Sequence, residues 1–394
     1  MTSLTRRYLV TIGGRLLSAV LQAGMVAFLA RSLGVESYGS FAIVASGCVF
    51  LLSIADLGMT AKALKMGSEH DRDRMVSTIS IWRAIVAILL VISLAVLGTL
   101  LSPSDLPLWL LTAYYVSGEA AGDMAVAVYQ GKLRPVTAIA ILVARRIAAL
   151  VPFVAGLGLL QAQFALMTAG TAGIVALLVV ALGTGSRPTS LLGFVRGNVR
   201  LILATSGRNL ANLDAFVVGA TSGVQFAALY GAAARLGNPV NIAIATLVQV
   251  AIPELAALRT PAERMREFRR LRLPVYSFAA AVALSSLLSP WIIVLLFGAD
   301  FAGAGPILAG VLVGAAVSAV TQLYMSWFLA GEVPAAVANS SIPIGLAGLT
   351  LLGIMSALVG VWGAAMAIVV WRMATFAVTV LAWRASTAEF RKPN

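Results

Sequence analysis

The chain has 394 residues, of which 60 % are hydrophobic and only 11 % are charged, and its formal net charge is +13. Soluble domains carry about 25 % charged residues, so this composition excludes a soluble protein and indicates a polytopic membrane protein. The single cysteine, Cys48, excludes an internal disulfide framework. The single histidine, His70, argues against a histidine metal site or a catalytic triad, and we expect neither a metal nor a cofactor.

The N-terminus places Arg6 and Arg7 before an apolar run, as a signal peptide does. The run is too long for a signal peptide and Arg15 interrupts it, so we expect a first span that stays attached. A span needs about 20 mostly apolar residues. On this criterion the sequence predicts twelve helices, at 9–30, 38–58, 82–101, 107–130, 136–159, 163–183, 202–222, 225–250, 273–296, 305–329, 335–356 and 358–382.

Basic residues are distributed unevenly over the predicted loops. If the N-terminus is cytoplasmic, Arg31 is the one basic residue in the outer loops, and the other loop cations are cytoplasmic. This asymmetry predicts a multi-pass membrane protein with both termini in the cytoplasm. It also explains the net charge without a nucleic-acid partner. Residues 259–274 predict an amphipathic helix on the cytoplasmic leaflet, where each basic residue gains about 1 kcal/mol from anionic headgroups.

The loops contain no motif for bond chemistry. A phosphate-cradling glycine loop, a zinc-ligand spacing and a Ser/His/Asp set are all missing from the sequence. No predicted loop is long enough for the catalytic domain of a glycan polymerase or ligase. We therefore expect a transporter rather than an enzyme, driven by a gradient or by its own substrate.

The two halves of the sequence echo one another. Residues 14–42 and 207–234 both open with Gly-Arg and approach their end with Tyr-Gly, and residues 129–138 are similar to 329–338. Asp105 and Asp300 occupy corresponding outer loops. Each echo keeps its membrane side, which predicts a parallel repeat with substrate bound between the halves. The expected domains are an N-terminal lobe at 1–185, a cytoplasmic linker at 186–200 and a C-terminal lobe at 201–394, each lobe with six helices.

Several segments together resemble a known family. They are LARSLGVESYGSFAIVAS (29–46), IADLGM (54–59), GRNLANLDAFVVG (207–219), LYGAAARLGNPV (229–240) and FGADFAGAG (297–305). In order and spacing they are similar to the polysaccharide flippases of the multidrug/oligosaccharidyl-lipid/polysaccharide (MOP) exporter superfamily. The resemblance implies an all-α, two-lobed bundle around a central cavity. It also implies flipping of a polyprenyl-diphosphate-linked oligosaccharide to the outer leaflet, in the synthesis of an O-antigen, capsule or exopolysaccharide.

Four charges lie inside two neighbouring predicted spans. Arg145 and Arg146 follow the short loop at 131–135 by about as many residues as Glu119 and Asp123 precede it. Antiparallel helices would bring all four to a similar depth, with Glu119 and Asp123 on one helix face. A buried neutral network is one reading. Adjacent arginines point about 100° apart on a helix, so we expect that they do not share one partner. One arginine would then be left to bind a substrate phosphate, or the two acids would be left to bind a coupling ion.

The other intramembrane charges are candidates for the same roles. Asp214 and Arg235 form either a structural ion pair or a gating pair. Arg15 and Arg208 occupy equivalent repeat positions and either capture a diphosphate across the cavity or reach toward the cytoplasmic headgroups. Arg372 has the same two alternatives. Asp56 is expected to cap a helix.

These residues define the predicted function. The candidate substrate-binding cations are Arg15, Arg208, Arg145, Arg146, Arg235 and Arg372, and the candidate coupling or ion-pair acids are Glu119, Asp123 and Asp214. An excess of arginines favours an anionic substrate, because the guanidinium group matches phosphate oxygens. The alternative is a cation-coupled multidrug or metabolite antiporter of the same superfamily. The expected partners are the lipid-linked oligosaccharide, membrane lipids and a glycan polymerase or glycosyltransferases, with the transporter itself a monomer.

Overall fold

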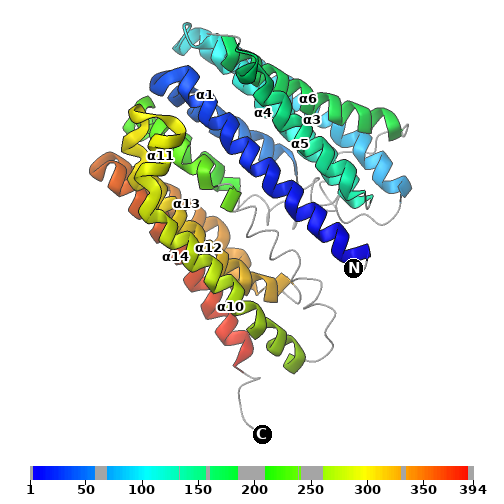
Figure 1. The fold of residues 1–394 in the computed structure, drawn as a ribbon, viewed down its shortest axis with the longest axis vertical. Coiled ribbons are helices and arrows are strands. Elements are labelled where there is room, and N and C mark those ends of the chain that lie inside the picture. The colour runs from blue at the N-terminus through cyan, green and yellow to red at the C-terminus, as the bar shows by residue number, and fades with distance from the viewer. Residues whose placement is uncertain are drawn as a thin grey trace. The chain divides into compact units, whose positions relative to one another are not determined.

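The structure is a computed structural model that describes residues 3–57, 69–132, 134–156, 160–184, 209–237, 239–240, 261–329 and 334–388. Every regular element in these ranges is a helix (Figure 1), which confirms the predicted all-α class. By its internal contacts the chain divides into two compact units, Met1–Ala228 and Leu229–Asn394. The predicted linker at 186–200 lies outside the described residues.

The described residues of the first unit include five long helices and, after the gap at 185–208, a short helical segment. In chain order these are α1 (Ser3–Ala55), α3 (Glu69–Leu101), α4 (Leu106–Gly131), α5 (Pro135–Val154), α6 (Gln161–Thr184), the 3-10 turn η2 (Leu210–Leu213) and α8 (Asp214–Ser222). Proline at the start of α4 and α5 removes an N–H that a first helical turn leaves unpaired in any case.

Helix α1 contains both of the first two predicted spans and bends between them at Gly34, where φ is 72° and ψ is 173°. Side chains disfavour a positive φ, so glycine allows the bend. Gly223 repeats this conformation after α8, with φ 91° and ψ 170°. A valine follows each of these glycines, and the next tyrosine along the chain, Tyr38 or Tyr230, is buried. The sequence echo therefore extends to the backbone.

Helix α4 lies at the centre of the first unit, in contact with α1, α3, α5 and α6. Its closest packing is against α6, because a Cβ on Gly118 would overlap the backbone of Gly170, and a Cβ on Gly173 would overlap the backbone of Gly118. Small residues allow such close approach of helices in membranes. The polar residues of α4 are consequently held among four helices.

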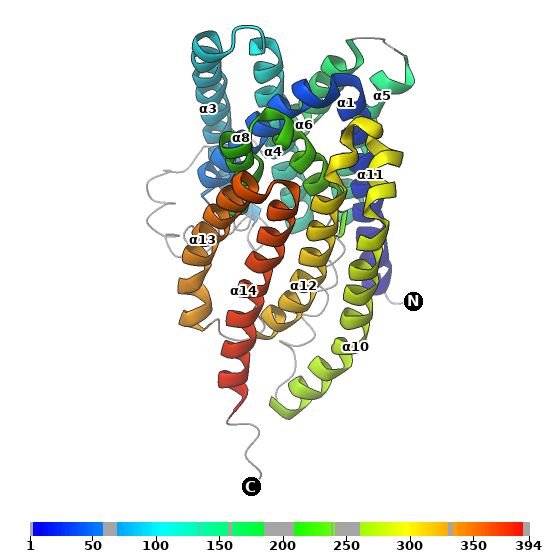
Figure 2. The same ribbon diagram turned by 90° about the vertical axis from the view of Figure 1, so that its left-hand side faces the viewer.

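The second unit contains α10 (Pro261–Ser285), η3 (Ser286–Leu288), α11 (Ser289–Phe297), η4 (Ala299–Ala304), α12 (Gly305–Leu329), α13 (Ala335–Val359) and α14 (Val361–Thr387). Helix α12 packs against both α10 and α14, and α13 packs against α14 (Figure 2). Aromatic residues of α10, α12 and α14 form a core around Phe268, which is fully buried.

Eight described segments are long and apolar enough to cross a membrane. They include both arms of α1 as one segment and the run from α10 through α11 as another. The predicted span at 305–329 has the bounds of α12, and those at 107–130 and 163–183 match α4 and α6 to within two residues. The count of twelve spans stays a prediction, because parts of 202–222 and 225–250 lie outside the described residues.

Candidate functional site

The structure joins the four intramembrane charges of α4 and α5 into one network. Arg145 is 1 % exposed, and its Nη2 lies 3.0 Å from Glu119 Oε2 and 3.0 Å from Asp123 Oδ1. Nη1 of Arg146 lies 2.5 Å from the same Glu119 oxygen. Two arginines and two carboxylates make the network formally neutral, as charges inside a membrane require.

One expectation about these residues is wrong. Adjacent arginines point apart on a helix, and we expected that they would not share a partner, yet Glu119 Oε2 accepts from both Arg145 and Arg146. The arginine side chain is long enough to turn its guanidinium back toward a common acceptor. Asp123, in contrast, bonds only Arg145 in the described contacts and keeps a side chain that is 61 % exposed.

A glycine of α4 makes room for the network. A Cβ on Gly122 would overlap the guanidinium of Arg145. Gly122 follows Gly118 by about one helical turn, so the same face of α4 admits α6 at Gly118 and the arginine at Gly122. The arrangement can hold two cations in a dry interior, and it fixes the spacing of α4 and α5.

A second ion pair, which the sequence analysis missed, joins the end of α1 to α3. Arg83 donates to Asp56 and to the backbone carbonyl of Ala120 on α4. Trp82 Nε1 donates to the carbonyl of Ala55 at 2.7 Å. Asp56 therefore forms an ion pair with Arg83. Its predicted role as a helix cap stays a prediction, because the residues after Leu57 lie outside the described chain. The signal for this pair was Arg83 itself, which stands within an apolar run.

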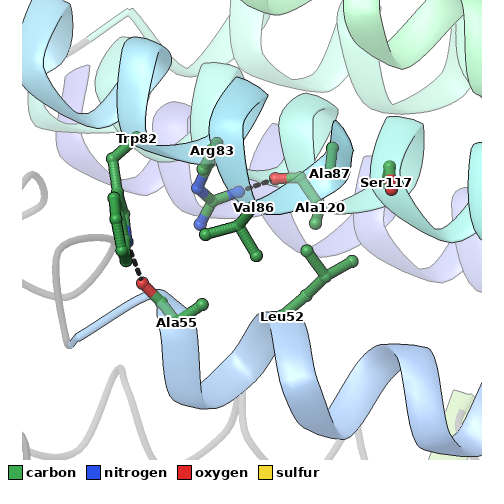
Figure 3. A pocket seen from close by; sticks show the side chains of 8 residues that line it. All are labelled: Leu52, Ala55, Trp82, Arg83, Val86, Ala87, Ser117 and Ala120. Carbon is green, nitrogen blue, oxygen red and sulfur yellow. Dashed lines mark hydrogen bonds between the residues drawn. The ribbon is translucent and has the colours of Figure 1, made fainter. Parts of the chain in front are cut away.

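Arg83 also lines a pocket between α1, α3 and α4 (Figure 3). The other lining residues are Leu52, Ala55, Trp82, Val86, Ala87, Ser117 and Ala120. The lining is mainly apolar, and the polar atoms of Arg83 and Trp82 are turned toward backbone carbonyls (Figure 3). The pocket is small and has one cation, so it is suited to a water molecule rather than to an oligosaccharide.

Arg15 lies on the first arm of α1 and contacts α4. Its Nη2 donates to Gln130 Oε1 at 3.3 Å. Gln130 lies at the C-terminal end of α4. Arg15 is half-buried, which leaves part of the guanidinium accessible.

The structure does not test the pairing of the remaining predicted residues. Arg208 falls outside the described part of the chain. The Asp214 carboxylate accepts from the N–H of Ala215 at 2.7 Å in the first unit, whereas Arg235 is partly buried in the second unit, so their pairing stays a prediction. The guanidinium carbon of Arg372 lies 5.6 Å from the centroid of the Trp371 ring, and Cγ of Arg372 packs against Gly314 of α12.

Three solved structures share this fold. A multidrug resistance MATE family transporter of the MOP superfamily, in an inward-facing conformation, matches with a TM-score of 0.66 and 14 % identity over 96 % of this chain and 98 % of its own. The lipid II flippase MurJ matches with a TM-score of 0.72 and 11 % identity, over 95 % of this chain and 87 % of its own. A MOP superfamily transporter from Pyrococcus furiosus, described as having a binding pocket of reversed polarity, matches with a TM-score of 0.59 and 14 % identity. This match covers 98 % of this chain and 95 % of its own.

These likenesses establish the fold as that of the MOP superfamily, which contains transporters and flippases. A model of the polysaccharide biosynthesis protein family matches residues 4–259. The chain therefore belongs to the polysaccharide biosynthesis protein family, and its long apolar helices make it a multi-pass membrane protein. No curated protein sequence matches the chain.

Proposed function

We propose that the protein flips a polyprenyl-diphosphate-linked oligosaccharide from the cytoplasmic to the outer leaflet of the bacterial inner membrane. It works by alternating access and makes or breaks no covalent bond. Membership of the polysaccharide biosynthesis family supports a glycan substrate. A flippase for lipid II shares the fold, which shows that the architecture can accommodate a lipid-linked substrate.

One observation carries the anionic part of this proposal. Glu119 is paired with Arg145 and Arg146, Asp123 is paired with Arg145, and Asp56 is paired with Arg83. Arg15, Arg235 and Arg372 then exceed the one remaining acid of the predicted set, Asp214. A positive excess lowers the cost of moving a diphosphate through hydrocarbon, and guanidinium groups can bind it bidentately.

We assign different roles to the predicted cations. Arg145 and Arg146 hold α4 against α5, because both are buried and neutralised. Arg15 is the better candidate for binding phosphate in the first unit, since it is less buried than Arg145 and Arg146 and donates to the neutral amide of Gln130. We place Arg208, Arg235 and Arg372 with Arg15 as cavity cations. In the antiporter alternative, Asp123 and Asp214 would bind the coupling ion.

Both termini are cytoplasmic in this proposal, and the transporter acts as a monomer that passes its substrate from glycosyltransferases to a polymerase. A deletion strain tests the function directly. Undecaprenyl-linked oligosaccharide should build up on the cytoplasmic leaflet, and the wild-type gene should clear it, whereas Arg15→Ala and Arg208→Ala should not. If no lipid-linked glycan builds up, the substrate is wrong and cation-coupled export of a small molecule becomes the better account.

A further inference from the structure

Four residues of α10 form a row at intervals of four, and so lie along one helix face: Arg264, Phe268, Arg272 and Tyr276. This face packs against α12 and α14. Phe268 is fully buried against Trp327 and Trp383, with ring centroids 5.5 Å away in both cases. The basic beginning of α10 is thereby anchored to the rest of the second unit.

Arg272 is held by rings rather than by an acid. Its guanidinium carbon lies 5.1 Å from the Phe268 ring and 5.2 Å from the Trp383 ring, within the range of cation–π attraction. Nε is buried and has no hydrogen-bond partner among the described residues. The nearest acid along the helix, Glu267, lies 3.1 Å from Arg270 instead. In the described part of the chain, Arg272 is therefore an oriented cation whose charge no carboxylate neutralises.

One turn further along α10, a phenol offers a hydrogen-bond donor. The hydroxyl oxygens of Tyr276 and Tyr324 are 3.0 Å apart. Their mutual hydrogen bond uses one of the two hydroxyl hydrogens, so the other is left to donate elsewhere. Tyr324 is 8 % exposed and Tyr276 is 40 % exposed, which makes the second donor accessible.

We propose that Arg272, Tyr276 and Tyr324 bind one phosphate group of a membrane lipid. A phosphate oxygen would accept from the guanidinium edge and from the free phenol hydrogen, and its negative charge would balance Arg272. Arg272 is the last residue of a basic segment and Leu273 begins an apolar one, which is the depth at which lipid phosphates lie. The exposed side chains of Arg266, Arg269 and Arg270 add non-specific attraction for an anionic leaflet.

The phosphate can come from two kinds of lipid. A phospholipid headgroup is one source, and the diphosphate of a transported polyprenyl lipid is the other, which rests on the flippase function proposed above. Binding and transport are separate measurements, so this site can fail while the flippase function stands. The flippase function can also fail while this site stands, because a phospholipid needs no transport to occupy the site.

Native mass spectrometry of the purified full-length protein tests the site, with phosphatidylglycerol and farnesyl diphosphate titrated separately. The variants are Arg272→Lys, which keeps the charge and loses the planar fork, and Tyr276→Phe, which removes one hydroxyl and keeps the ring. Arg269→Gln is the matched control, because it removes an exposed charge of the same helix. We expect Arg272→Lys to weaken binding about tenfold and Tyr276→Phe about fivefold, as the loss of charge-assisted hydrogen bonds would, with less than a twofold change for the control.

The two titrations separate the sources. Weaker binding of phosphatidylglycerol alone identifies the headgroup, and weaker binding of farnesyl diphosphate alone identifies the transported lipid. Equal affinity of wild type, Arg272→Lys and Tyr276→Phe for both probes would overturn the site. Tyr276→Phe keeps the proposal testable if Arg272→Lys does not fold, since it leaves the aromatic core intact.

Discussion

The Cα of Gly122 on α4 lies against the guanidinium of Arg145 on α5, so closely that a Cβ there would overlap it. We predict that Gly122→Ala displaces Arg145 from Glu119 and Asp123 and lowers the thermal midpoint of the purified protein by several degrees. Gly24→Ala is the matched control, because that helical glycine has nothing within 4 Å of the added carbon. Similar midpoints for the two variants would show that Arg145 is not held in this position.

Glu119 should matter more than Asp123 to stability. Glu119 Oε2 accepts from two buried arginines, so Glu119→Gln leaves an uncompensated positive charge inside the unit. Removing one member of a buried pair costs about 3–5 kcal/mol. Asp123→Asn should cost much less, because that side chain is 61 % exposed and bonds one arginine. Thermal unfolding in detergent measures both, and an equal or larger loss for Asp123→Asn would contradict the network.

Asp56 and Arg83 should be energetically coupled. They form an ion pair between the end of α1 and α3, and Arg83 also donates to the Ala120 carbonyl. A double-mutant cycle of Asp56→Ala and Arg83→Met should give a coupling free energy of about 0.5–3 kcal/mol, the range for residues in direct contact. The unfolding free energy of the four proteins supplies the cycle. Additive losses would mean that the pair does not form in the folded protein.

Arg15 should be needed for transport more than for folding. Arg15 donates to the amide oxygen of Gln130, and Arg15→Gln keeps a hydrogen-bond donor for that amide while removing the charge. We predict normal expression and thermal midpoint with transport reduced at least about tenfold, as the loss of one charge-assisted hydrogen bond implies. Arg134→Gln, an exposed charge at the start of α5, should transport as wild type does. A fall in stability that matched the fall in transport would make Arg15 a structural residue.

Part of the network could be predicted from the sequence because helical geometry is regular. Glu119 and Asp123 are four residues apart, and a short loop sets Arg145 at the same depth on the next helix. The sharing of Glu119 by Arg145 and Arg146 could not be predicted, because it depends on side-chain rotamers rather than on backbone direction. Gly122 gave no signal at all, since its function is the absence of a side chain.

The pair of Arg83 and Asp56 was missed for a different reason. Arg83 is the second residue of the span predicted at 82–101, whereas α3 begins at Glu69, well before it. A charge near the end of a predicted span can belong to a loop or to a helix, and the apolar pattern does not decide between them. The Gly34 bend, in contrast, was visible as the boundary between two predicted spans.

The central claim is that the substrate is a polyprenyl-diphosphate-linked oligosaccharide. The most direct measurement reconstitutes the protein in vesicles that contain this lipid with a labelled glycan, and follows the fraction that becomes accessible to a glycosidase on one side. The account predicts accessibility that rises with time in wild-type vesicles and is at least about tenfold slower with Arg15→Gln. Vesicles that flip the lipid no faster than protein-free ones, while a cation gradient drives export of a small molecule, would contradict it.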